Sequence, residues 1–338
     1  MKKISSAHLL LVLLLVLQTV FSLIVGLTHI SLPVVPALLV SQLMLIIPFA
    51  VYCIVTRQNP LKLIRLKKIS GGTVAMALLV ILFSYPVVMV LNMISMLFVD
   101  NAMINVMPSA LSLGLPLAVL LMAVVPAVVE ETVFRGTIYN TYSRRRPLAG
   151  IFLSALVFGL MHMNFNQMPY AIYLGIVMAF MVEASDSIVT SILMHFTING
   201  TSTVISFFSM NMLSNLSGAS SELSDVYGDL LDESGLSDKL GGDASGLLFD
   251  TLSPELLRKM LGSLILIAVV CLVIVAAMIY VTFIINHRQP KAIFSAQHEE
   301  TAMVAGLGGR MRKNRMIDIF LVIFIIYTLS QCIISAVG

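Results

Sequence analysis

Long apolar stretches alternate with short polar segments along most of the chain. A membrane-spanning helix needs about 20 mostly apolar residues. The candidate spans are residues 7–28, 33–56, 73–98, 109–140, 148–166, 168–184, 187–210, 261–286 and 316–336. The spans at 148–166 and 168–184 are short, so eight spans instead of nine is the alternative count. The pattern predicts an all-α fold, a polytopic bundle of membrane helices.

Composition supports a membrane protein. Of 338 residues, 59% are hydrophobic and 11% are charged, whereas about a quarter of the residues in a soluble globular protein are charged. The net charge of +3 does not indicate a nucleic-acid partner, because lysine and arginine are confined to a few loops. The expected surroundings are therefore a lipid bilayer. Cys53, Cys271 and Cys332 each lie in an apolar stretch, which predicts inert, buried thiols.

Basic residues mark one side of the predicted bundle. They precede the first span and follow spans two, four and eight: Lys2, Lys3, Arg57, Lys62, Arg65, Lys67, Lys68, Arg144, Arg145, Arg146, Arg288, Lys291, Arg310, Arg312, Lys313 and Arg315. By the positive-inside rule this side faces the cytoplasm. The N-terminus is then cytoplasmic and, with nine spans, the C-terminus is outside. Residues 9–27 lack a clear small-residue cleavage site and are expected to remain as the first span. Short loops without eukaryotic targeting signals suggest a bacterial plasma membrane.

The same pattern suggests four regions. Residues 1–100 form an N-terminal three-span region, 105–210 a four-span core, 211–258 an acidic external loop, and 259–338 a two-span region. The loop assignment rests on residues 211–250, which contain eight acidic residues and one lysine and are rich in Ser and Gly. Such a composition cannot bury a core. Ser253 and Pro254 read as the N-cap and first position of the next helix.

Charged residues end one of the apolar stretches. Residues 111–129 carry no charge and are followed directly by Glu130, Glu131 and Arg135. Glu131 and Arg135 stand at i and i+4 with the glutamate first, the favourable order for an ion pair on a helix. Glu130 lies about 100° around the helix from Glu131, and this pairing leaves it without a local partner. Ionisable groups inside a membrane usually indicate function.

Two of the six histidines also lie within spans. His162 shares a helix face with Phe158, and the small Gly159 beside them would let a neighbouring helix approach. His195 shares a face with Asn199 on another span. His8, His29, His287 and His298 lie at span ends or in loops. Each buried histidine alone could be a packing residue, but the set suggests one polar cavity.

This set of side chains suits hydrolysis of an amide bond. A carboxylate beside a neutral imidazole can activate water as a general base. An imidazole and a carboxamide on one helix face can donate hydrogen bonds to an oxyanion. Glu130, His162 and His195 could instead hold a zinc ion with an open position. The HExxH motif is absent, so the sequence favours a site without a cofactor and leaves zinc as the alternative.

Three short motifs carry a family resemblance. EETVFR (130–135), FGLMH (158–162) and HFTIN (195–199) fit the patterns EExxxR, FxxxH and HxxxN. In this order on successive membrane helices, they resemble the CAAX-protease and bacteriocin-processing family, also called the Abi family. The resemblance covers roughly residues 109–205. It implies an intramembrane endopeptidase whose catalytic core is the region 105–210. Members of this family were long described as metalloproteases, and a metal-independent glutamate mechanism is now favoured for them.

The resemblance also implies roles for the motif residues. Glu130 would be the base that activates water, and His162 would help to position that water. His195 and Asn199 would form the oxyanion hole. Structural support would come from Glu131, Arg135 and Phe158. The expected partner is a membrane-associated peptide or protein substrate, while the oligomeric state is left open.

Two other functions compete with the protease. An ion- or proton-coupled transporter could use the same glutamate and histidines as a relay, but we detect no internal repeat of the kind many transporters carry. A non-catalytic immunity or scaffold protein could use the acidic segment 211–258 as a contact surface. Nothing in the sequence indicates a prenyl-binding pocket, so the substrate is not specified.

Overall fold

The computed structural model describes residues 3–28, 30, 32–99, 103–144, 146–233, 254–294 and 319–337. The helices are α1 (Lys3–Thr28), α2 (Val34–Thr56), α3 (Pro60–Leu63), α4 (Gly71–Met96), α5 (Met103–Leu111), α6 (Leu115–Val119), η1 (Leu120–Val124), α7 (Val125–Glu131), η2 (Thr132–Tyr139), α8 (Asn140–Ser143), α9 (Pro147–Met161), α10 (Met168–Ser185), α11 (Ile188–Glu233), α14 (Pro254–Ile285), η3 (Pro290–Phe294) and α16 (Ile319–Val337). The described residues contain no strand. The predicted all-α class is therefore confirmed.

The predicted spans correspond to apolar helices. Segments long and apolar enough to cross a membrane are His8–Val25, Val34–Thr56, Gly71–Met96, Leu115–Ser143, Met168–Ser185, Ile188–Met212 and Leu261–Ile285. Two shorter apolar helices, Pro147–Met161 and Leu321–Ile333, occupy the positions of the fifth and ninth predicted spans. The chain is thus a polytopic membrane bundle.

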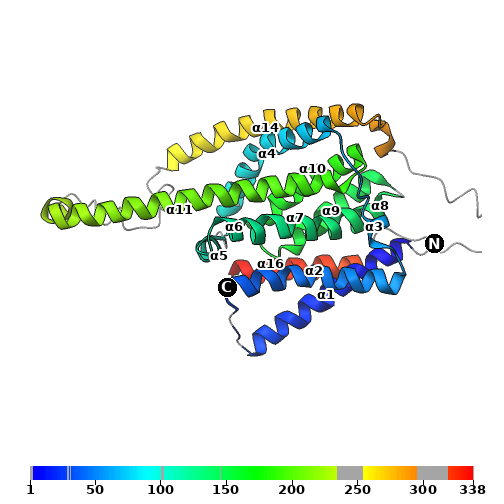
Figure 1. The fold of residues 1–338 in the computed structure, drawn as a ribbon, viewed down its shortest axis with the longest axis horizontal. Helices are drawn as coiled ribbons and strands as arrows, with labels where there is room; N and C mark the ends of the chain where they lie inside the picture. The colour runs from blue at the N-terminus through cyan, green and yellow to red at the C-terminus, as the bar shows by residue number, and fades with distance from the viewer. Residues whose placement is uncertain are drawn as a thin grey trace, which may run out of the picture.

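The helices lie roughly side by side (Figure 1). The α4–α14 pair covers one side, α10 and α11 follow, then α7 and α9, and α1, α2 and α16 lie on the opposite side. The start of α1 and the end of α16 lie at opposite ends of the bundle. This arrangement fits an odd number of crossings. It also places α7, which carries the two glutamates, between α2 and α11.

The fourth span begins later than predicted. The apolar pattern suggested one helix over 109–140, but α5 ends at Leu111 and a turn follows. Gly114 has a φ of 87°, a conformation that glycine adopts without steric cost. Leu115 then starts a continuous helical segment that runs to Ser143. The prediction missed this break because residues 112–114 carry no charge that would interrupt the uncharged stretch.

Two π-helical segments flank α7. Residues Leu120–Val124 form η1 and Thr132–Tyr139 form η2. A π-helical turn contains an extra residue and shifts the helix face of the residues beyond it, and such turns are frequent at functional sites. Glu130 and Glu131 end α7, directly between the two. The helix geometry is therefore irregular on both sides of the charged pair.

The predicted external loop is partly helical. We expected an irregular loop over 211–258, but α11 continues to Glu233. Residues 211–233 contain no proline and only two glycines, Gly218 and Gly228, so the sequence has no strong helix breaker there. The next described helix, α14, starts at Pro254 as predicted. Ser253 and the rest of 234–253 lie outside the described residues.

Close packing of α9 against α10 depends on Gly159. A Cβ atom at this position would collide with the side chain of Ile172 and lie 3.0 Å from the Met168 carbonyl oxygen. The predicted close approach at Gly159 is confirmed.

The three cysteines are buried, as predicted, and form no disulfide.

Candidate active site

Glu131 lies at the centre of a buried ionic triad. Its Oε1 atom lies 2.8 Å from Arg135 Nη1 and 2.8 Å from His195 Nδ1. The side chains of Glu131 and Arg135 are both fully buried. The ion pair expected from the i, i+4 spacing is present, and the carboxylate also binds α11 through His195. Glu131 therefore joins η2 to α11 as well as holding Arg135.

Phe158 packs against this triad from α9. The Arg135 guanidinium lies over the Phe158 ring at 4.0 Å from its centroid, within the range of a cation–π contact. The rings of His162 and His195 meet the same phenyl ring edge-on, at centroid distances of 5.0 and 6.1 Å. The ring explains how the cation is accommodated, because Arg135 Nε and Nη2 have no hydrogen-bond partner among the described residues.

The contact with Glu131 fixes the protonation pattern of His195. A carboxylate can only accept hydrogen bonds, so Nδ1 of His195 must be the donor. In the neutral ring, Nε2 is then an acceptor. Nε2 can donate to an oxyanion only when the ring is protonated. The oxyanion role expected for His195 therefore requires the imidazolium form.

Glu130 lies next to His195 but does not bond it directly. Its Oε2 atom is 4.0 Å from His195 Nε2, and its side chain is 14% exposed. Its Oε1 atom accepts a hydrogen bond from Gln42 Nε2 of α2 at 3.4 Å. Two acceptors 4.0 Å apart suit a water molecule that donates one hydrogen to each.

His162 follows the last turn of α9. Its Nδ1 atom bonds the carbonyl oxygen of Phe158 at 2.9 Å. Because a carbonyl oxygen accepts, Nδ1 again carries the proton and Nε2 is an acceptor. The histidine lines the same cavity as Glu130. The structure thus brings Glu130, His162 and His195 close to the Phe158 ring.

Asn199 has a partner that the sequence did not suggest. Its Nδ2 atom donates to the carbonyl oxygen of Met122 at 3.2 Å. In an α-helix this oxygen would accept from the N–H of residue 126, but Pro126 has no N–H. Asn199 therefore supplies a donor to a carbonyl that cannot receive the α-helical bond from position 126. One hydrogen of its Nδ2 is used in this way and the other remains for a second acceptor.

A cavity of about 390 Å³ opens beside Glu130. Its lining comes from α1 and α2 on one side and from α7, η2, α9 and the following turn on the other: Gln18, Phe21, Leu32, Ala37, Val40, Ser41, Gln42, Met44, Leu45, Glu130, Phe134, Phe158, Met161, His162, Met163 and Gln167. The lining is mainly apolar, and among the described residues Glu130 and His162 are its only acidic or basic side chains. Such a cavity suits an uncharged segment of a chain.

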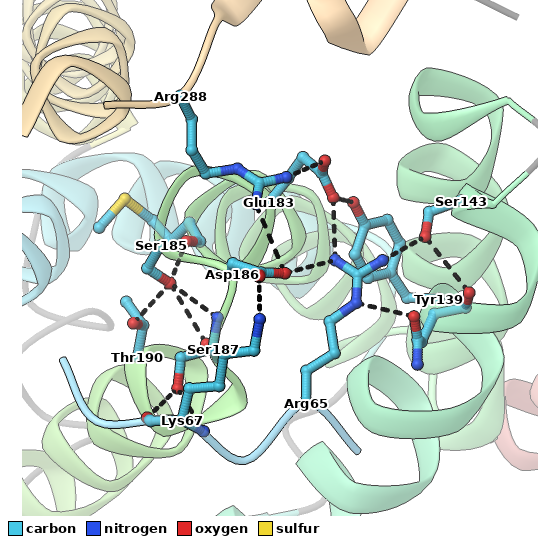
Figure 2. Close-up of polar contacts among 12 residues, drawn as sticks. Arg65, Lys67, Tyr139, Ser143, Glu183, Ser185, Asp186, Ser187, Thr190 and Arg288 are labelled. Carbon is cyan, nitrogen blue, oxygen red and sulfur yellow. Dashed lines mark hydrogen bonds and ion pairs between the residues drawn. The ribbon is translucent and has the colours of Figure 1, made fainter. Parts of the chain in front are cut away.

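A second polar network lies at the end of the bundle where the basic loops gather (Figure 2). Glu183 of α10 accepts from Arg65 at 3.1 Å, from Arg288 at 2.9 Å and from the Tyr139 hydroxyl at 2.6 Å. Asp186, in the turn after α10, pairs with Arg65 and Arg288 and also with Lys67. Segments distant in sequence are thereby joined.

This network holds η2 from its far end. Arg65 Nε donates to Asn140 Oδ1 at 2.7 Å, and its Nη2 donates to Ser143 at 3.1 Å (Figure 2). Asn140 and Ser143 belong to α8, which continues η2 directly. The helix that carries Arg135 is thus fixed at one end by Glu131 and at the other by Arg65. The charged residues of the network pair with one another, which indicates a structural role for the network.

Zinc was the alternative interpretation for Glu130, His162 and His195. Across the described part of the chain, no three His, Cys, Asp or Glu side chains lie close enough together to share a metal ion. We therefore derive no step through a metal.

Comparison with known proteins supports the motif interpretation. Residues 112–201 match the family model described as type II CAAX prenyl endopeptidase Rce1-like. This segment is Rce1-like. The match spans all three motifs and confirms the resemblance to the CAAX-protease and bacteriocin-processing family there. No curated protein and no solved structure matches the chain.

Two polar residues of the spans were missed by the sequence interpretation. Gln42 lies in an apolar stretch (VSQLM) and Glu183 near the end of another (FMVEAS). Each is a polar group inside a predicted span, the same signal that drew attention to Glu130. Gln42 lies outside the Rce1-like segment, which spans 112–201, so a motif could not have found it. Half of the residues that line the cavity also belong to α1 and α2, outside that segment.

Proposed function

We propose that the chain is an intramembrane endopeptidase that hydrolyses a peptide bond with water activated by Glu130. The observation that carries the proposal is the 4.0 Å separation between His195 Nε2 and Oε2 of Glu130, which lines the cavity. Both atoms are acceptors, so a water between them would direct its oxygen lone pairs away from both. The Rce1-like match supports protease chemistry for the same segment.

The reaction needs only water and the substrate amide. Glu130 takes a proton while the water oxygen forms a bond to the carbonyl carbon. The resulting oxyanion accepts from the second N–H of Asn199, while His195 Nε2, an acceptor in this tautomer, holds the remaining hydrogen of the attacking water. The carbon–nitrogen bond then breaks, and the leaving amine takes the proton from Glu130. His162 lines the same cavity and limits where the water can lie.

Support for the catalytic groups comes from the surrounding triad. Glu131 holds His195 in the tautomer whose Nε2 accepts, and Arg135 balances the charge of that carboxylate. Phe158 supports Arg135 and both histidine rings. The proposed mechanism assigns every step to side chains of the chain and to water.

The proposed substrate is a membrane-associated peptide or the tail of a membrane protein. A mostly apolar cavity that opens beside Glu130 favours an uncharged segment at the cleavage site. We further propose a bacterial plasma membrane with a cytoplasmic N-terminus. The basic loops support this orientation, because a charge network that includes Arg65 and Arg288 gathers at one end of the bundle.

The decisive experiment compares new protein N-termini in membranes of cells that express the wild type or Glu130→Gln at equal levels. We expect a small set of termini with the wild type and none with the variant. Val128→Ala is the matched control, because Val128 lies on the same helix, is 47% exposed and does not line the cavity. Identical termini with all three folded proteins would refute the proposal.

A further inference from the structure

Gln42 lies outside the Rce1-like segment and hydrogen-bonds Glu130, the proposed base. It lies on α2, eighty-eight positions before Glu130. Its Nε2 atom donates to Glu130 Oε1 at 3.4 Å, and both residues line the cavity. The contact therefore connects the proposed base to a helix that the family match, limited to 112–201, does not include.

The orientation of the Gln42 amide follows from its partner. A carboxylate accepts only, so the amide nitrogen must face Glu130 and the amide oxygen must point elsewhere. That oxygen is buried and has no hydrogen-bond partner among the described residues. Because the amide oxygen of Gln42 is unpaired, the hydrogen bond of its amide nitrogen is what holds the side chain in place. The bond to Glu130 is thus the contact that explains the position of this polar side chain.

The two oxygens of Glu130 consequently have different surroundings. Oε1 faces Gln42, while Oε2 faces His195 Nε2 at 4.0 Å. A carboxylate in an open cavity could rotate about its last bond and exchange these oxygens. The hydrogen bond from Gln42 opposes this rotation, because turning the plane of the carboxylate would break that bond.

We propose that Gln42 is a positioning residue for the base: it holds the Glu130 carboxylate so that Oε2 is the oxygen that takes the proton from water. This inference rests on the proposed function. It means that the Rce1-like segment is not a complete catalytic unit in this protein, because α2 supplies a group that orients the base.

The test replaces Gln42 by methionine, which has similar length and volume but no donor. The substrate is a peptide that carries the cleavage sequence found by comparing protein N-termini as described above. Its cleavage is measured with the full chain in detergent micelles. We expect kcat to fall about tenfold, as for loss of one hydrogen bond to a charged group. KM should stay within about twofold, because Gln42 acts through Glu130 and not on the substrate.

Two matched variants separate positioning from packing. Leu43→Met places the same residue at the neighbouring α2 position, which is 49% exposed and outside the cavity lining, and should leave kcat unchanged. In a Glu130→Asp background the carboxylate is withdrawn from Gln42, so Gln42→Met should then change kcat less than about twofold.

The outcomes distinguish this inference from the proposed function. If Glu130→Gln is inactive but Gln42→Met retains the kcat of the wild type, the positioning role is wrong and the protease proposal stands. A rise in KM without loss of kcat would assign Gln42 to substrate binding and also overturn the inference. If no terminus depends on Glu130, both proposals fail.

Discussion

Nδ1 of His195 lies 2.8 Å from Oε1 of Glu131, on a different helix. The same oxygen accepts from Arg135 at 2.8 Å. One buried oxygen thus fixes the tautomer of a histidine and balances a buried cation. The adjacent residue Glu130 does neither. Two successive glutamates therefore have different tasks, because they lie about 100° apart around α7 and face different nitrogens of His195.

The first prediction separates these tasks by their effect on stability. Glu131→Gln should destabilise the fold by about 3 kcal/mol or more, because it leaves the Arg135 cation buried without a counter-charge. Glu130→Gln should change stability little, since Glu130 is partly exposed and has one long hydrogen bond. Thermal denaturation of both variants in the same detergent measures the difference. Equal melting temperatures would contradict the assignment.

The second prediction concerns the two nitrogens of His195. In His195→Asn the side-chain amide can take the place of Nδ1 and still donate to Glu131, but nothing replaces Nε2. We expect this variant to fold with near wild-type stability and to lose activity by about a hundredfold or more. In His195→Gln the amide reaches the Nε2 position instead, so the bond to Glu131 is lost and stability should fall further. Cleavage rates and melting temperatures of the pair test this order.

The membrane spans and the motif residues could be predicted from the sequence, and for the same physical reason. Apolar runs determine which segments cross the membrane, and a polar residue within such a run is conspicuous. Glu130, His162 and His195 were found in this way and do come together in space. The pairing of Glu131 with Arg135 followed from spacing on one helix.

Contacts between helices distant in sequence could not be predicted in this manner. Local periodicity does not say which face of α2 meets α7, so the bond between Gln42 and Glu130 was not foreseen. The same holds for the contact between Asn199 and the Met122 carbonyl, which depends on a proline in one helix and an amide in another. The irregular turns at η1 and η2 also have no pattern in the sequence that we recognised.

The third prediction tests orientation in the membrane. Lys68 and Ser112 are both exposed. Lys68 lies in the loop before α4 and Ser112 in the turn after α5, so the predicted span formed by α4 separates them. If the basic loops are cytoplasmic, an impermeant maleimide should label Ser112→Cys in intact cells and Lys68→Cys only after permeabilisation. The native cysteines are buried, so their background labelling should be low. The reverse pattern would show that the N-terminus is outside.

The fourth prediction concerns packing near His162. Gly159→Ala places a Cβ 3.0 Å from the Met168 carbonyl oxygen and against Ile172, so α9 and α10 must separate. We expect a loss of about 1–3 kcal/mol in stability, together with reduced activity. Gly262→Ala is the control, because a Cβ there meets no atom within 4 Å. That variant should be as stable as the wild type or slightly more, since alanine is the better helix former.

The last prediction decides how Asn199 contributes. Asn199→Ala leaves the Met122 carbonyl without its donor and should cost about 1 kcal/mol of stability. Pro126→Ala restores a backbone N–H four residues after that carbonyl, so the same Asn199→Ala change should cost almost nothing in this background. Activity should behave differently. If the second N–H of Asn199 stabilises the oxyanion, Asn199→Ala should reduce kcat about a hundredfold or more in both backgrounds. A kcat that recovers together with stability would show instead that Asn199 only supports η1, because restoring the helix bond would then make the amide dispensable.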